Sequence, residues 1–174
     1  MMQHYGVPTR LLDWTEGAMI GLHFSVRNLD SVNIPCVWVL DPKWLNKVVS
    51  KMEMVYYSDP DYLERIDKRV LKYFEDEKKL PDYPVPVLPS HVDNRIVAQK
   101  SVFTIHGKRR DGFFDLSKKH RDEARIVQLC IDTKEAKVIK EQLVTLGITE
   151  STLFPDLEGL AGDIKWDYEL KYKH

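Results

Sequence analysis

The sequence has little cysteine and no long hydrophobic run. Cys36 and Cys130 are the only cysteines among 174 residues, and both lie in apolar stretches. We therefore expect two buried free thiols rather than a disulfide or a metal site. No stretch approaches the roughly 18 apolar residues of a membrane-spanning helix. The opening residues also lack the basic-then-apolar pattern of a signal peptide. These absences predict a cytoplasmic protein with no membrane span.

An excess of one charge is missing as well. The chain has 26 Lys and Arg against 27 Asp and Glu, a formal charge of −1. This balance gives no general electrostatic reason to bind nucleic acid. The sequence also contains no P-loop, GxGxxG, HExxH, paired CxxC or GxSxG string. These absences argue against P-loop nucleotide hydrolysis, zinc proteolysis and α/β-hydrolase chemistry.

The composition is that of a folded domain, with 43% hydrophobic and 30% charged residues. A chain of this length buries about 70% of its surface, enough for one full core. We therefore expect a single domain over residues 1–174. Four of the nine prolines fall within residues 79–94, where they favour extended backbone and exclude a helix. This stretch is a domain linker or a loop that crosses one domain. We favour the loop, because neither flank alone looks like a complete core.

Hydrophobic periodicity predicts helices and strands that interleave along the chain. The expected helices span about 16–28, 42–51, 60–76, 134–146 and 157–164, and the expected strands 34–40, 102–106 and 123–131. Asp13 and Thr15 are candidate caps of the first helix, and Gly147 is placed to end the fourth. Asp156, Glu158 and Asp163 are expected to be capping and surface residues. The predicted fold class is mixed α/β, a single domain with a mixed sheet and several packed helices.

The first 15 residues are the least generic part of the chain. They pack an amide, an imidazole, a phenol, a guanidinium, a carboxylate and an indole into one turn-and-strand segment, Gln3-His4-Tyr5-Gly6-Val7-Pro8-Thr9-Arg10-Leu11-Leu12-Asp13-Trp14-Thr15. Leu11, Leu12 and Trp14 are expected in the core, with Thr9, Arg10 and Asp13 on a polar side. The alternative for Arg10 and Asp13 is a salt bridge that ties the turn to the helix start. His23, on an apolar helix face, is expected to be a satisfied core histidine.

This opening string resembles the second block of the FRG domain, a family named for a Phe-Arg-Gly motif. The resemblance continues in a block with Arg95-Ile96, Ala98-Gln99 and Phe103-Thr104, and in the string 153–161, LFPDLEGLA. It covers roughly residues 2–162. No Phe-Arg-Gly string occurs, and the chain begins where the second block of the family begins. We therefore expect the first part of the family's domain to be missing.

A pattern-level resemblance to ADP-ribosyltransferases implies a more specific activity. It implies binding of NAD or a related nucleotide and cleavage of the nicotinamide–ribose bond. The alternative is a non-catalytic binding or regulatory module, and the sequence assigns no catalytic residue. The candidate ligand-binding residues are Gln3, His4, Tyr5, Thr9, Arg10, Asp13, Arg95 and Gln99. We expect the two polar segments to converge on one cleft, the alternative being partial exposure of Arg95 and Gln99 on a rim.

The missing first block also predicts a partner. It would leave uncovered the burial-prone residues of the opening segment, among them Tyr5, Leu11 and Trp14. A large apolar patch tends to be covered by another surface. We expect a symmetric homodimer formed through this segment. The alternative is that helices of the same chain close over the gap.

Overall fold

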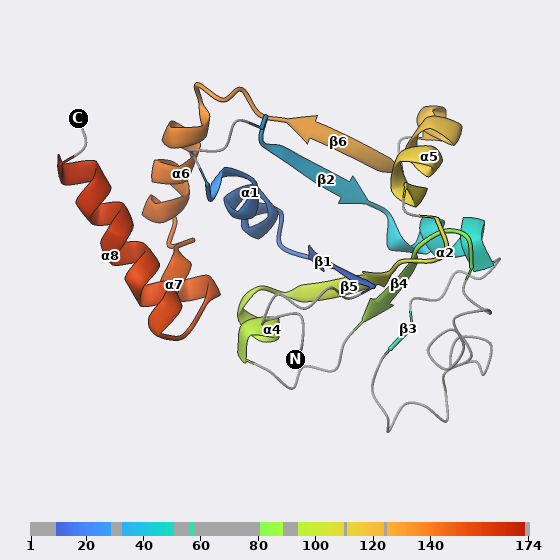
Figure 1. The fold of residues 1–174 in the computed structure, drawn as a ribbon, viewed down its shortest axis with the longest axis horizontal. Helices are drawn as coiled ribbons and strands as arrows, with labels where there is room; N and C mark the ends of the chain where they lie inside the picture. The colour runs from blue at the N-terminus through green and yellow to red at the C-terminus, as the bar shows by residue number, and fades with distance from the viewer. Residues whose placement is uncertain are drawn as a thin grey trace. The chain divides into compact units, whose positions relative to one another are not determined.

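A computed structural model describes residues 10–28, 33–50, 56–57, 81–88, 94–109, 111–123 and 125–172 (Figure 1). Helices and strands interleave along these residues and the strands form two sheets, one of four strands and one of two. The four-stranded sheet contains both parallel and antiparallel pairs. The predicted mixed α/β fold class is confirmed. No helix in the described ranges is long and apolar enough to cross a membrane.

The four-stranded sheet has the order β1-β5-β4-β3. Its strands are β1 (Leu11–Thr15), β5 (Ser101–Ile105), β4 (Val85–Leu88) and β3 (Tyr56–Tyr57). β4 runs antiparallel to β5, with Val85 opposite Ile105. β3 runs parallel to β4, with Tyr56 opposite Val87. Val87 and Ile105 are buried and pack together, so this pairing also forms a small core.

β4 corrects the expectation of an irregular loop over residues 79–94. Prolines do favour extended backbone there, but Val85–Leu88 is a strand with a neighbour on each side. Pro86 lies within it, opposite Thr104 of β5. A proline has no N–H to donate to a ladder. β3 pairs only with Val87 and Leu88, so no ladder hydrogen bond on the β3 side requires an N–H at Pro86.

The two-stranded sheet joins β2 (Cys36–Leu40) to β6 (Ile126–Cys130). The Ile131 N–H donates to the Pro35 carbonyl at 2.8 Å, and the Asp41 N–H donates to the Arg125 carbonyl at 2.9 Å. From the first bond to the second, the numbering rises from 35 to 41 on one strand and falls from 131 to 125 on the other. The pair is therefore antiparallel. The prediction of buried thiols is wrong: Cys130 is exposed and Cys36 is half-buried. The apolar stretches that contain them are strands that are only partly buried.

Three helices lie close to predicted ranges, a fourth begins where predicted, and the others were not predicted. The helices of the described residues are α1 (Ala18–Val26), α2 (Pro42–Ser50), α4 (Asn94–Ala98), α5 (Gly112–Lys119), a 3₁₀ turn (Arg121–Glu123), α6 (Ala136–Thr145), α7 (Glu150–Leu153) and α8 (Leu157–Tyr172). Of these, α4, α5 and α7 are the ones that were not predicted. α6 ends before Gly147, whose φ of 79° confirms its role as a stop. α8 continues to Tyr172 instead of ending at Ile164. The helix expected over 60–76 lies outside the described residues.

The chain forms two compact units, each made of three separate stretches. Unit 1 comprises Met1–Trp14, Trp38–Ser90 and Val102–Val127, and unit 2 comprises Thr15–Val37, His91–Ser101 and Gln128–His174. In unit 1, Leu45 and Leu116 are fully buried with Trp44 and Ile126. Unit 2 buries one cluster with Ile20, Leu153 and Phe154, and a second with Val26, Ala136 and Leu143. The number of domains stays a prediction.

The opening strand differs from the sequence expectation. β1 is an end strand of its sheet, and Leu11 and Leu12 are 37% and 41% exposed, so the prediction that they anchor the core is wrong. Trp14 is half-buried, and its Nε1–H donates to the Thr104 hydroxyl at 3.0 Å. Asp13 lies within β1 and is not the N-cap of α1, which is Gly17. The Thr15 hydroxyl does accept the Gly17 N–H at 3.0 Å.

Candidate functional site

The most buried carboxylate among the described residues belongs to Glu150, the first residue of α7 in unit 2. The Arg27 Nε–H donates to both carboxylate oxygens, at 2.9 and 3.0 Å. The His23 Nε2 lies 3.2 Å from one of them. Burial raises the pKa of Glu150, but hydrogen bonds from His23 and Arg27 outweigh burial and hold this pKa at about 2. Glu150 is therefore ionised and paired at neutral pH.

His23 contacts Glu150 from the face of α1 that packs inward. Its side chain is 1% exposed, so the predicted core position is confirmed, but the prediction that its polar atoms are all satisfied is not. Its Nε2 is paired with Glu150, whereas its Nδ1 has no hydrogen-bond partner among the described residues. The contact of Nε2 with the Glu150 carboxylate makes His23 part of a buried polar cluster. It is not a purely apolar core position.

Two arginines meet the Phe154 ring just after α7. The Arg27 guanidinium carbon lies 4.4 Å from the ring centroid, and that of Arg95 lies 5.3 Å from it. Both distances are within the range of attraction between a cation and an aromatic face. Phe24 of α1 packs edge-on against the same ring, with centroids 6.0 Å apart. Phe154 thus connects α1, α4 and the α7–α8 turn.

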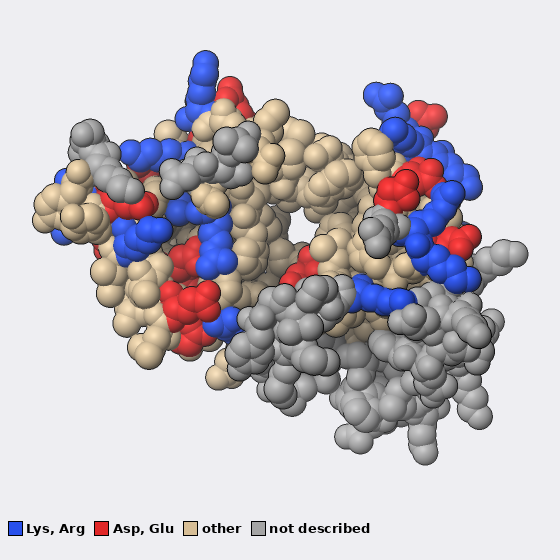
Figure 2. Space-filling model, viewed as in Figure 1, with Lys and Arg blue, Asp and Glu red and all other residues tan. Residues whose placement is uncertain are grey.

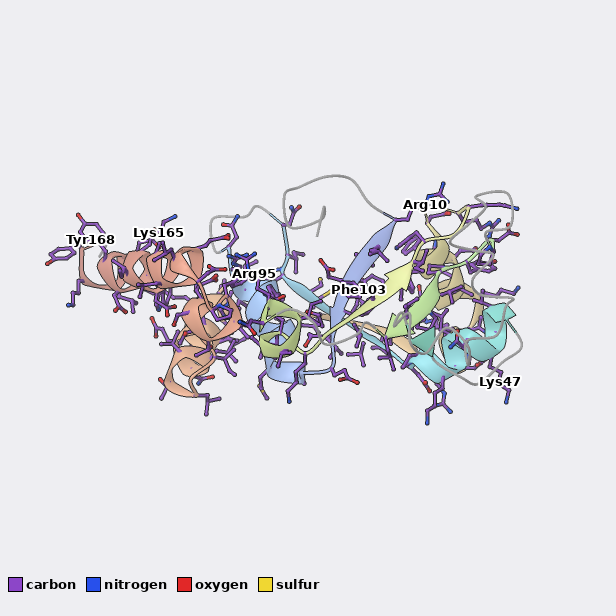
Figure 3. All side chains as sticks on the ribbon, turned by 90° about the horizontal axis from the view of Figure 1, so that it is seen from below. Arg10, Lys47, Arg95, Phe103, Lys165 and Tyr168 are labelled. Carbon is purple, nitrogen blue, oxygen red and sulfur yellow. The ribbon has the colours of Figure 1, made fainter. Side chains whose placement is uncertain are left out.

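Arg95 and Gln99, both predicted ligand residues, come together at the α7–α8 turn. Arg95 Nε–H donates to the Asp156 carboxylate at 2.8 Å, and its terminal nitrogen donates to Glu158 at 2.9 Å. Gln99 donates its amide N–H to the Leu153 carbonyl at 3.0 Å. The Arg95 hydrogen bond lowers the pKa of Asp156. Figure 3 labels Arg95 on α4, and Figure 2 shows acidic and basic side chains together over the start of α8.

α8 is fixed to α7 through backbone contacts. The Asp163 carboxylate accepts the Glu150 N–H at 2.9 Å and the Ser151 N–H at 3.2 Å. A carboxylate at a helix N-terminus also interacts favourably with the helix dipole. Asp156 accepts the N–H groups of Glu158 and Gly159 at the start of α8. The prediction that Asp156 and Asp163 are capping residues is confirmed.

Unit 2 also contains a pocket of about 440 Å³ at the end of α1. Its wall includes Phe24, Arg27, Asn28, Asn33 and Cys36. The Arg27 side chain is 40% exposed, although its guanidinium also pairs with Glu150. The pocket therefore combines an aromatic ring, a guanidinium and two amide side chains. Such a wall suits a small polar ligand with an aromatic or negatively charged part.

The remaining predicted ligand residues are placed less completely. Gln3, His4, Tyr5 and Thr9 lie outside the described residues. Arg10 and Asp13 are exposed and belong to unit 1, where the Arg10 carbonyl accepts the His106 N–H at 2.7 Å. The convergence of six of these residues on one cleft stays a prediction, as does the homodimer through the opening segment; the six are Gln3, His4, Thr9, Arg10, Arg95 and Gln99.

Sequence reasoning missed the Glu150 cluster. Glu150 is 127 residues from His23 and 123 from Arg27, so no local spacing links them. The one signal that could have indicated it is the position of Glu150, three residues before the string 153–161 that the family resemblance picks out. A metal centre has no support: the described ranges contain no group of three or more His, Cys, Asp or Glu side chains arranged to hold an ion.

In the comparison with known proteins, one family model matches part of the chain. Residues 1–33 match the FRG domain. No curated protein and no solved structure matches the chain. The match lies within the first part of the resemblance seen in the sequence, and the wider similarity to ADP-ribosyltransferases has no support from these comparisons. Phe24, Ser25, Arg27, Asn28 and Asn33 of the pocket wall all fall within the matched residues.

Proposed function

We propose that the chain is an FRG-type binding module that takes a small ligand of the nucleotide class, with NAD as the first candidate, in the pocket at the end of α1. The observation that carries the proposal is the position of this pocket. Five residues of its wall lie in the stretch that matches the FRG domain, and its volume of about 440 Å³ suits a small ligand.

The residue types of the wall support this ligand class. Phe24 is 38% exposed and offers a ring against which a base can pack. Arg27 presents a 40% exposed guanidinium beside the pocket, and although one side of it pairs with Glu150, its remaining N–H groups can donate to a phosphate. Asn28 and Asn33 carry side-chain amides that both donate and accept hydrogen bonds. Together these groups match the aromatic, polar and anionic parts of a nucleotide.

Binding without chemistry is favoured over catalysis. Glu150 is a buried carboxylate and therefore a candidate catalytic acid. Both of its oxygens, however, already accept hydrogen bonds from Arg27. Arg95 and Gln99 are engaged with the α7–α8 turn. None of these three side chains is placed to stabilise a cation or to activate an acceptor. The alternative is an ADP-ribosyltransferase-like enzyme that releases nicotinamide from NAD.

Titration of the protein with NAD by calorimetry tests the proposal, with nicotinamide release followed chromatographically in the same samples. We expect binding with no release. Asn33→Asp adds a negative charge to the pocket wall and should weaken NAD binding about fivefold, the effect of roughly 1 kcal/mol between nearby charges in water. Gln142→Glu is the matched control, because it makes the same amide-to-carboxylate change on exposed α6, outside the pocket wall.

Three outcomes would decide against the proposal. Nicotinamide release would favour the enzyme. Equal weakening by Asn33→Asp and Gln142→Glu would mean that the charge acts at long range and not in the pocket. Absence of binding for NAD, AMP and ATP alike would remove the nucleotide class as the ligand.

A further inference from the structure

The two cysteines of the chain lie side by side. The Sγ atoms of Cys36 and Cys130 are 3.1 Å apart, although the residues are separated by 94 positions in sequence. Both are free thiols in the structure, Cys130 is exposed, and both belong to unit 2. Because these are the only cysteines of the protein, each has one possible partner within the chain.

The strand register places the two residues directly opposite each other. Residue 35 is bonded to residue 131, and residue 41 to residue 125. Counting inward from either bond, Cys36 faces Cys130. Bonded and non-bonded pairs alternate along an antiparallel ladder, so Cys36 and Cys130 form a non-hydrogen-bonded pair, where Cα atoms are about 4.5 Å apart. Disulfides occur at Cα separations of about 4.4 to 6.8 Å, so a bridge needs no large backbone movement.

We propose that Cys36 and Cys130 are a thiol–disulfide modification site, which an oxidant of the small-molecule disulfide class, such as oxidised glutathione, converts into a reversible bridge between β2 and β6. Cys36 also belongs to the wall of the pocket at the end of α1, but the bridge requires no ligand in that pocket and stands apart from the proposed nucleotide binding. Exposed disulfides are generally easier to reduce than buried structural ones, so this bridge belongs to the reversible kind.

The reaction begins at Cys130, the more exposed sulfur. Its thiolate attacks one sulfur of oxidised glutathione, an S–S bond forms, and one glutathione thiolate leaves. The Cys36 thiolate then attacks the Cys130 sulfur of this mixed disulfide and displaces the second glutathione thiolate. The two protons lost by the cysteines end on the two reduced glutathione molecules. The protein is oxidised by two electrons and the glutathione disulfide is reduced by two.

The surroundings of Cys130 affect the rate of this reaction. The side-chain hydrogen bond with Cys36 raises the pKa of Cys130, and partial desolvation acts in the same direction. The attacking species is the thiolate, so the rate of oxidation should rise as the pH increases above neutral. Once formed, the bridge closes a long loop and restricts the unfolded chain. The oxidised protein should therefore need more urea to unfold.

The test equilibrates the full chain in glutathione buffers of increasing oxidised fraction and counts thiols by alkylation and intact mass. We expect both thiols to disappear together, with a mass lower by two hydrogen atoms and a monomeric band on a non-reducing gel. Reduced glutathione should restore both thiols. Peptide mapping of the wild-type protein should recover residues 36 and 130 in one cross-linked fragment, a readout that depends on no variant.

Cys36→Ser and Cys130→Ser are matched controls, since each leaves one thiol. Each variant should gain one glutathionyl group and form no internal bridge. The proposal is overturned if the wild-type protein also gains glutathionyl groups without losing two hydrogens, or if its bridge links two chains. It is equally overturned if both thiols persist at the most oxidising ratio, or if the bridge resists reduced glutathione.

Discussion

At the scale of single residues, the charge of Glu150 is the most consequential feature of unit 2. The residue is 9% exposed, yet its carboxylate is ionised because Arg27 and His23 hold it. Breaking one partner of such a pair leaves the other buried without compensation, which is costly. The contribution of Glu150 to stability should therefore be large for a single side chain and should depend on pH.

We expect Glu150→Gln to lower the free energy of unfolding at pH 7 by about 2 kcal/mol, the range of hydrogen bonds to charged groups. This is less than the pKa shift alone implies, because solvent screens part of the pair. The pKa of Glu150 is about 2 in the folded protein, against 4.5 as its ordinary value. The stabilisation is therefore present above pH 4.5 and is lost as the pH falls from there towards 2.

Urea unfolding of both proteins between pH 7 and pH 2.5 measures this effect. The difference in stability between wild type and Glu150→Gln should narrow as the pH falls through this window. Glu135→Gln is the control, because Glu135 is exposed and its side chain makes no capping bond. A constant difference at all pH values would show that Glu150 acts through its shape and not its charge.

The residue scale also shows what sequence reasoning could and could not supply. The resemblance to the FRG domain indicated Arg95 and Gln99, and their spacing of four positions lets the two side chains share a helix face. It could not indicate their partners, which lie about 60 residues further along the chain for Arg95 and 54 for Gln99. Leu11 and Leu12 were wrongly predicted to lie in the core for a related reason. Their apolar type does not reveal that β1 is an end strand of its sheet, where side chains are more exposed.

At the scale of elements, the close approach of α8 to the end of α7 depends on Gly159. A Cβ atom at this position would lie 2.0 Å from the Phe154 carbonyl oxygen and 2.7 Å from that of Glu150. Both neighbours are backbone atoms, so neither can rotate away. This contact sets the turn that presents Phe154 to the two arginines.

We expect Gly159→Ala to destabilise the protein by about 3 kcal/mol, the upper range for overpacking. Gly147→Ala provides the comparison. Gly147 has a φ of 79°, but a Cβ there would meet no atom within 4 Å, so only backbone strain of about 1 kcal/mol is expected. Thermal unfolding of the two variants measures both effects. Equal losses of stability in the two variants would mean that the backbone at the α7–α8 contact moves to accommodate the added methyl group.

Element boundaries were predictable where a local signal exists. The stop at Gly147 and the caps at Asp156 and Asp163 follow from residue type, and the structure confirms them. β4 was not predicted, because a proline such as Pro86 argues against a strand that has neighbours on both sides. The strand is possible here because β3 does not pair with Pro86. α8 was predicted too short: beyond Ile164, Trp166 is buried but Tyr168 and Tyr172 are exposed, so the apolar residues there form no regular buried stripe. Figure 3 shows Tyr168 pointing outward from α8.

At the scale of the whole molecule, the two units share their strands. The boundaries between units fall inside β1, β2, β5 and β6, with one more between Ser90 and His91. Strands are cooperative elements, and a strand cannot melt in one half while it remains paired in the other without fraying its ladder. The expectation of a single domain makes a specific prediction for unfolding.

We expect one cooperative unfolding transition in urea. Tryptophan fluorescence reports mainly on unit 1, which contains Trp14, Trp38 and Trp44, whereas unit 2 contains Trp166. Far-ultraviolet circular dichroism reports on helices of both units. Coincident transitions by the two probes are expected for a single cooperative unit. Two separated midpoints would show that the units unfold independently and that the chain has two domains.

The interleaving of the units also has a consequence for synthesis on the ribosome. Unit 1 includes Met1–Trp14 and, much later in the chain, Val102–Val127, and unit 2 includes Gln128–His174. At bacterial or eukaryotic elongation rates of about 5 to 20 residues per second, on the order of 10 s passes before unit 1 has all its parts. During that interval β1 has no partner strand β5, and its exposed leucines are available to chaperones. The yield of folded protein in cells should therefore depend on the amount of available chaperone, and not only on the stability of the folded protein.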